Sequence, residues 1–138
     1  MEKLIESIKH HEGCSLTPYE DTEGILTIGY GHNLRYGISL ATANQILRED
    51  ISKAIDSFWR LPFAVILNCN TERRRVLVEM LYNLGFERML EFRKMLGALE
   101  ASDFQLAADE MLDSKWARQV GQRAKTLADT MRTGVWPW

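Results

Sequence analysis

The chain has 138 residues, a length that fits one compact domain, in one or two lobes, and argues against two independent domains. Hydrophobic residues make up 46% of it and charged residues 26%, so it can fill a core without disulfides or a structural metal. Its formal net charge of −2 argues against generic nucleic-acid binding, because such proteins usually carry a strong basic excess.

The first helix is predicted over 3–11, where Leu4 and Ile8 lie four residues apart on one face. Glu12 falls next on the same apolar stripe, and Gly13 supplies a helix stop. A carboxyl group at a position where a core residue is expected would pack against apolar side chains. Apolar surroundings raise the pKa of a carboxyl group, so it stays protonated near neutral pH, as a general acid requires.

The segment 17–32 changes to β structure. Residues 25–28 read as a strand, and a polar turn that contains Asp21 is predicted over 20–24. Gly29 and Gly31 flank Tyr30, which indicates tight bends or a close approach of the backbone. This hairpin is the only β structure that we expect.

Everything after the hairpin reads as helical. Ser39 is expected to cap a long helix with apolar residues at spacings of three and four as far as Phe58, and Pro62 is expected to break or restart it. Four more helices follow, the third opened by a capping box of Ser102 and Gln105. Their apolar positions cover 76–84, 92–99, 106–112 and 124–131, with stops at Gly85 and Gly134.

The predicted fold class is therefore α+β and predominantly helical. A small hairpin lobe, about 13–60, would be joined by one long helix to a helical lobe made of about 1–12 and 61–138. A cleft between two such lobes is the ordinary place for a ligand.

The two cysteines, Cys14 and Cys69, lie far apart, without CxxC spacing or clustered histidines. Two free thiols are therefore predicted, with neither a disulfide nor a metal site. The N-terminal residues form no apolar segment of signal-peptide length, and no run of about 18 apolar residues occurs in the chain. Neither a signal peptide nor membrane insertion is expected.

Glu12 and Asp21 form a candidate pair for glycoside hydrolysis. That reaction needs an acid for the leaving oxygen and a second carboxylate for water or the developing cation. The contrast between an apolar helix face and a polar turn suits this division of labour. The pairing alone is weak, because a chain with 19 acidic residues offers many such pairs.

The spacing around the pair is more specific. Asp21 follows Glu12 by nine residues, Thr27 follows Asp21 by six, and Gly29-Tyr30-Gly31-His32 comes directly afterwards. This pattern resembles the active-site region of phage-type lysozymes, or endolysins, of glycoside hydrolase family 24. The likeness continues through 82–85, 114–116, 122–125 and 132–136 and is thin from 33 to 70.

The resemblance implies a two-lobed lysozyme fold and a muramidase that hydrolyses the β-1,4 bond between N-acetylmuramic acid and N-acetylglucosamine, which lyses the host cell. Glu12 would be the general acid, Asp21 would orient or deprotonate the attacking water, and Thr27 would hold that water. No cofactor is expected. The partner would be a peptidoglycan strand, not nucleic acid, bound by a monomer that waits in the cytoplasm of the infected cell until release.

Alignment with the family assigns further residues. Arg123 takes the place of an arginine that pairs with the acid, and His32 and Asp50 take the places of a stabilising ion pair, so all three would support the site. Met95 suits core packing at least as well as sugar contact. The residues that would line the saccharide cleft are Asn33, Tyr82, Asn83, Met95 and Glu110.

The chain departs from well-known family members in two ways. The segment between His32 and Asp50 is shorter, so the hairpin lobe must be trimmed, and the mild negative charge would weaken steering towards an anionic wall. Two alternatives stay open. A lytic transglycosylase would need Glu12 but neither Asp21 nor Thr27, and a wall-binding module would keep the fold without catalysis.

Overall fold

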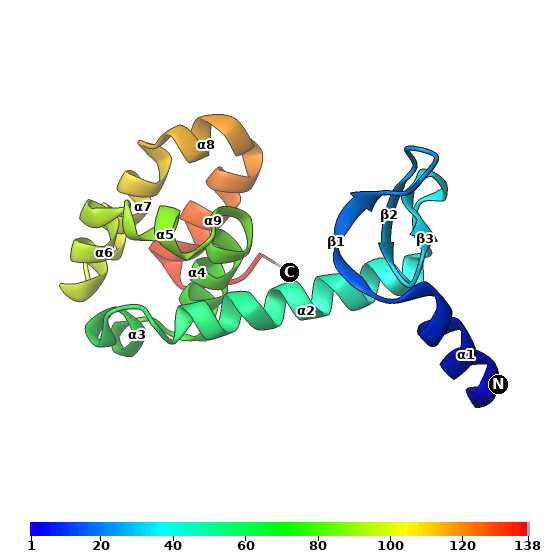
Figure 1. Cartoon of the computed structure of the whole chain (residues 1–138). Helices are drawn as coiled ribbons and strands as arrows, with labels where there is room; N and C mark the ends of the chain where they lie inside the picture. Colours follow the sequence, from blue (N-terminus) through cyan, green and yellow to red (C-terminus); the bar gives the residue numbers. More distant parts are fainter. Residues whose placement is uncertain (138) are drawn as a thin grey trace. The chain divides into compact units, whose positions relative to one another are not determined.

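The computed structural model describes residues 1–137, which fold as two compact units that divide between residues 46 and 47. Helices predominate and accompany a three-stranded antiparallel sheet, so the predicted α+β class is confirmed (Figure 1). Among the described residues, no helix is both long enough and apolar enough to cross a membrane.

The first unit contains α1, a small sheet and a single-turn 3-10 helix. Its strands are antiparallel in the order β1-β2-β3, with Tyr19 opposite Thr27 and Ile28 opposite His32. The hairpin is confirmed as β1 and β2, whereas the third strand was not predicted because two residues are too few to show alternation. The bounds are α1 Glu2–Glu12, β1 Ser15–Glu20, β2 Leu26–Gly29, β3 His32–Asn33 and the 3-10 helix Leu34–Tyr36.

Helix α1 ends where the sequence predicts. Gly13 has a φ of 67°, and its N–H donates to the Lys9 carbonyl at 3.1 Å. The burial expected for Glu12 is wrong, because α1 has no buried residue and Leu4 and Ile8 are 59% and 45% exposed. The spacing of apolar residues identifies an amphipathic face, but a pattern along one helix does not determine what covers that face.

The long helix α2 (Leu40–Phe58) begins in the first unit and ends in the second. Ser39 Oγ accepts a hydrogen bond from the Thr42 N–H at 3.1 Å, which confirms the predicted cap. By its contacts α1 groups with the first unit, whereas the sequence assigned 1–12 to the helical lobe. The division into two units follows contacts along the chain and does not test the predicted lobes, so their boundaries stay predictions.

The second unit is built from helices. Four predicted helices correspond to α4, α6, α7 and α9, and the stops at Gly85 and Gly134 are confirmed. Helices α3, α5 and α8 were not predicted, because five or six residues are too few to display a helical period. The bounds are α3 Phe63–Asn68, α4 Thr71–Leu84, α5 Phe86–Leu90, α6 Arg93–Glu100, α7 Phe104–Leu112, α8 Lys115–Val120 and α9 Gln122–Thr133.

Helix α7 begins one residue later than the predicted capping box requires. Asp103 is the cap in place of Ser102, and its Oδ1 accepts a hydrogen bond from the Leu106 N–H at 3.0 Å. Ser102 lies in the preceding turn with a φ of 55°. Both residue types suit a helix cap, so their preferences alone do not distinguish two adjacent positions.

The core of the second unit is rich in flexible methionine and leucine side chains. Leu77, Met80 and Met111, from α4 and α7, are fully buried. Cys69 is a free thiol buried in the same core, and Cys14 is an exposed free thiol, as predicted. The packing of this unit thus depends on shape and apolar contact.

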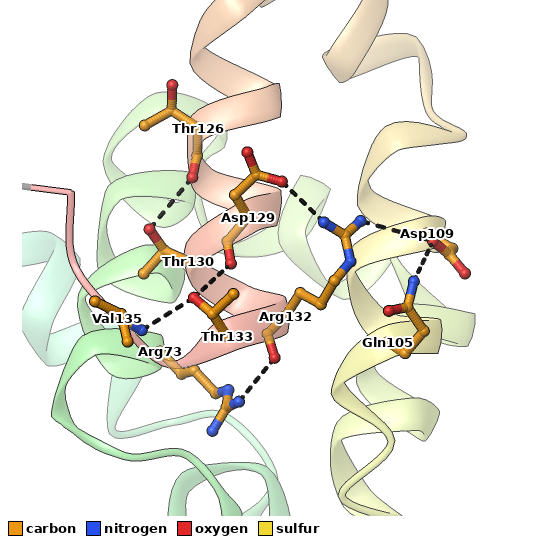
Figure 2. A network of polar contacts seen from close by, with 9 residues as sticks. All are labelled: Arg73, Gln105, Asp109, Thr126, Asp129, Thr130, Arg132, Thr133 and Val135. Carbon is orange, nitrogen blue, oxygen red and sulfur yellow. Dashed lines mark hydrogen bonds and ion pairs between the residues drawn. The ribbon is translucent and has the colours of Figure 1, made fainter.

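A polar network fixes the C-terminal end of α9 to the start of α4 (Figure 2). Arg73 donates from Nε to the Met131 carbonyl at 2.7 Å and from Nη2 to the Arg132 carbonyl at 3.0 Å. Asn70 Nδ2 donates to the Gly134 carbonyl at 3.0 Å. The last carbonyls of a helix have no partner within the helix, so these donors satisfy groups that would otherwise face water.

Candidate active site

Asp21 organises the turn between β1 and β2. Its Oδ1 accepts hydrogen bonds from the N–H groups of Glu23 and Ile25, each at 2.8 Å. The Asp21 N–H in turn donates to the Ile25 carbonyl at 2.9 Å. Both side-chain hydrogen bonds end on the same oxygen, so the carboxylate is held in one orientation by its own turn.

Thr27 lies in the central strand β2 and is 3% exposed. Its Oγ1 donates to the Ile25 carbonyl at 2.8 Å, so the hydroxyl hydrogen is committed and the oxygen keeps lone pairs to accept from a water. Ile25 therefore holds both side chains through its backbone, Asp21 through the N–H and Thr27 through the carbonyl. The predicted water-handling residues are coupled through one peptide segment.

Glu12 is the last residue of α1, and its carboxylate lies against the turn between β2 and β3. A Cβ placed on Gly31 would be 2.9 Å from Glu12 Oε2 and 3.3 Å from Glu12 Cδ. One turn of helix earlier, Lys9 Nζ lies 5.8 Å from the centre of the Tyr30 ring, a cation–π contact with the same turn. The end of α1 is thus in contact with the sheet.

The two carboxylates are associated with opposite ends of one strand. Asp21 belongs to the turn that enters β2, and Glu12 lies against Gly31 in the turn that leaves it. The four residues of β2 lie between these two turns in the chain. Thr27 lies between them. The predicted trio is therefore distributed along one strand and the turns at its two ends.

The predicted residues that follow the sheet have local partners. His32 Nε2 lies 2.8 Å from the Gly37 carbonyl, and Asn33 Oδ1 accepts from the Arg35 N–H at 2.8 Å. Both contacts hold the 3-10 helix against β3. Asp50, the predicted partner of His32, lies 3.5 Å from Lys53 Nζ. The ion pair between His32 and Asp50 stays a prediction.

Arg123, on α9, has a partner that the sequence did not indicate. Its Nε donates to Glu79 Oε1 on α4 at 3.0 Å, and each side chain is about one third exposed. The two residues line an apolar hollow of 560 Å³ in the second unit, together with Tyr82. Their wide separation in the chain left no local signal for the pair. The pairing of Arg123 with Glu12 stays a prediction.

The other predicted substrate residues gather around Trp116. Trp116 Nε1 donates to Asn83 Oδ1 at 2.7 Å, and the indole lines a cavity of 410 Å³ with Met95 and Glu110. Met95 is fully buried in the core, which favours the packing role over sugar contact, whereas Glu110 is half-buried. Four cations (Arg88, Arg93, Lys94 and Lys115) line the same cavity.

Among the described residues, no group of three or more histidine, cysteine, aspartate or glutamate side chains is arranged to hold a metal ion. What the first unit offers is carboxylates, a hydroxyl and backbone groups. Such an arrangement supports proton transfer to a substrate oxygen and activation of a water.

Comparison with known proteins places the chain among lysozymes. The family model described as phage lysozyme matches residues 9–132, a span that includes Glu12, Asp21 and Thr27. A protein named probable T4-type lysozyme 1, from Dictyostelium discoideum, is 24% identical, with 94% of each chain covered. The endolysin of Salmonella phage P22 is 30% identical over 78% of this chain and 77% of its own.

A second endolysin gives the same result. The endolysin of Acyrthosiphon pisum secondary endosymbiont phage 1 is 30% identical over 88% of this chain and 84% of its own length. The family match extends across the sheet and the helical unit. The chain therefore belongs to the phage lysozyme family and is a glycosidase.

Proposed function

We propose that the protein is an endolysin-type muramidase that hydrolyses the β-1,4 bond between N-acetylmuramic acid and N-acetylglucosamine in peptidoglycan. The observation that carries this proposal is the arrangement of Glu12, Asp21 and Thr27 around the single strand β2. The names of the relatives, lysozyme and endolysin, support the same substrate class.

In this proposal Glu12 protonates the leaving oxygen of the glycosidic bond. Its side chain is exposed at the end of α1, so a polymeric substrate can reach it without rearrangement of the core. The bound strand would itself displace water from around the carboxyl group, which favours proton transfer to the substrate. The contact with Gly31 gives the group a defined place before the substrate arrives.

Asp21 and Thr27 act on the attacking water. Two hydrogen bonds fix one oxygen of the Asp21 carboxylate, which leaves its second oxygen to accept a proton from the water. Thr27 accepts a hydrogen bond from the same water, because its own hydroxyl hydrogen is donated to the Ile25 carbonyl. Inverting glycosidases keep their carboxyl groups about 6.5–9.5 Å apart to leave room for this water, against about 5–5.5 Å in retaining enzymes. Because Asp21 and Thr27 are proposed to act on a water and not directly on the sugar, the proposal implies inversion.

The second unit is proposed to bind the rest of the strand. Tyr82 is 43% exposed and Glu110 is half-buried beside Trp116, so both are available to a ligand. Asn83 would act through Trp116, which it holds by a hydrogen bond. Asn33 would contribute from β3. We further propose that the protein acts as a monomer and waits in the host cytoplasm until it is released to the wall.

The products of wild-type cleavage test the proposal. Purified peptidoglycan is digested, and the released muropeptides are identified by mass. Hydrolysis predicts fragments that end in N-acetylmuramic acid with a free reducing end, heavier than the anhydro form by the mass of one water molecule. Anhydro products would instead identify a lytic transglycosylase. Binding without any release of fragments would identify a wall-binding module.

A further inference from the structure

Two glycines near the end of β2, Gly29 as its last residue and Gly31 in the turn that follows, have similar backbone conformations and different surroundings. Gly29 has a φ of 69° and Gly31 a φ of 76°, both in the left-handed region that disfavours other residues. A Cβ placed on Gly29 meets nothing within 4 Å, whereas one placed on Gly31 lies 2.9 Å from Glu12 Oε2. Backbone conformation explains Gly29, but it leaves the contact at Gly31 unexplained.

The space above Gly31 is filled by a side chain that the proposed reaction uses. A Cβ at this position would also lie 3.3 Å from Glu12 Cδ and 3.9 Å from Glu12 Cγ. Any side chain at residue 31 would therefore compete with the outer half of Glu12 for the same place. The carboxylate is the far end of an exposed side chain, so it is the group that would be displaced while α1 and the sheet stay in place.

We propose that Gly31 is a positioning residue. Because it has no Cβ, it leaves the space in which the Glu12 carboxylate lies for proton transfer. The inference rests on the proposed role of Glu12 as the general acid. A displacement of about 1 Å in a reacting group costs about 10²-fold in rate. Gly31→Ala should therefore lower kcat about 100-fold with little change in KM, because the general acid acts in the transition state.

Gly29→Ala is the matched control. It introduces the same methyl group two residues earlier, at the end of β2, at nearly the same φ but away from Glu12. We expect the two variants to lose similar amounts of Tm, because each forces alanine into a left-handed conformation and the group displaced by Gly31→Ala is flexible. Only Gly31→Ala should lose the additional factor in kcat.

A second measurement tests the contact without activity. The side-chain amide protons introduced by Glu12→Gln should show a nuclear Overhauser effect to the Gly31 Hα protons. Absence of that effect would overturn the inference. So would a much larger loss of Tm in Gly31→Ala than in Gly29→Ala, since that result would make the glycine a purely structural requirement.

The same variants separate failure of this inference from failure of the proposed function. If Glu12→Gln keeps the wild-type kcat, the role of Glu12 as general acid fails and the inference fails with it. If Glu12→Gln abolishes cleavage but Gly31→Ala matches Gly29→Ala in kcat, the proposed function stands and the role of Gly31 is refuted.

Discussion

Two substitutions of Asp21 should separate its structural role from its chemical role. Asp21→Asn keeps an oxygen for the N–H groups of Glu23 and Ile25 and removes the charge, whereas Asp21→Ala removes both hydrogen bonds. A hydrogen bond to a charged group contributes about 1.5–3 kcal/mol, and the pair is partly exposed to water. Asp21→Ala should therefore destabilise the first unit by about 2–3 kcal/mol, and Asp21→Asn by less than about 1 kcal/mol.

Amide hydrogen exchange measures this difference at the site. All four tryptophans follow residue 47, so their fluorescence reports on the second unit and would miss the effect. A loss of about 2–3 kcal/mol lowers the protection of the Ile25 N–H by about 30–150-fold in Asp21→Ala, and Asp21→Asn should stay near wild type. Both variants should lose about 10²–10⁴-fold in kcat. Equal protection in the two variants would show that the Asp21 side-chain oxygen does not stabilise the turn through the Ile25 N–H.

Three further predictions concern the second unit. Burial raises the pKa of the Cys69 thiol to about 11. At pH 8 a thiol reagent should therefore label Cys14 alone, because Cys14 is exposed and Cys69 is buried. Cys69 should react only on unfolding or as the pH approaches 11. Arg73→Met removes two hydrogen bonds to carbonyls at the end of α9 and should lower the free energy of unfolding, measured in urea, by about 2–3 kcal/mol. The control Arg75→Met breaks a surface ion pair with Glu72 and should lower it by less than about 1 kcal/mol. Asn83→Leu leaves the Trp116 indole N–H without its partner and should cost about 1–3 kcal/mol with a shift in tryptophan emission, and unchanged emission would contradict the assigned contact.

The sequence predicted those features whose signals lie within a few residues. The Ser39 cap and the stop at Gly13 depend on short-range preferences, and the structure confirms both. The glycine pattern around Tyr30 indicated tight bends or a close backbone approach, and the second description applies at Gly31, where Glu12 lies. Helix caps, helix stops and glycine turns of this kind can be predicted without knowledge of the fold.

The errors arise where distant segments or adjacent alternatives decide the outcome. Glu12 was expected among apolar side chains, but helical spacing does not determine what covers a helix face. The ion pair between Arg123 and Glu79 was an omission and not an error, because no local pattern connects two residues so far apart in the chain. The cap of α7 moved from Ser102 to Asp103, because both residue types are good caps.

The sequence proposed residues for the candidate site but gave no indication of the contacts that hold them. The spacing of Glu12, Asp21 and Thr27 predicted the trio through family resemblance, and its catalytic role stays a prediction. That the Ile25 backbone holds both Asp21 and Thr27 could not be read from the sequence, since isoleucine contributes there only its N–H and carbonyl. Backbone hydrogen bonding depends on conformation, which residue types restrict without fixing.

The most direct test of the account compares Glu12→Gln with Glu6→Gln on purified peptidoglycan. Both glutamates are exposed on α1, and Glu6 makes only a weak surface ion pair with Lys9 at 3.8 Å. Glu6→Gln should release reducing-end muropeptides at close to the wild-type rate. Glu12→Gln should stay folded and release fewer by a factor of about 10² or more. Wild-type cleavage by folded Glu12→Gln would contradict the assignment of Glu12 as the acid and with it the proposed mechanism.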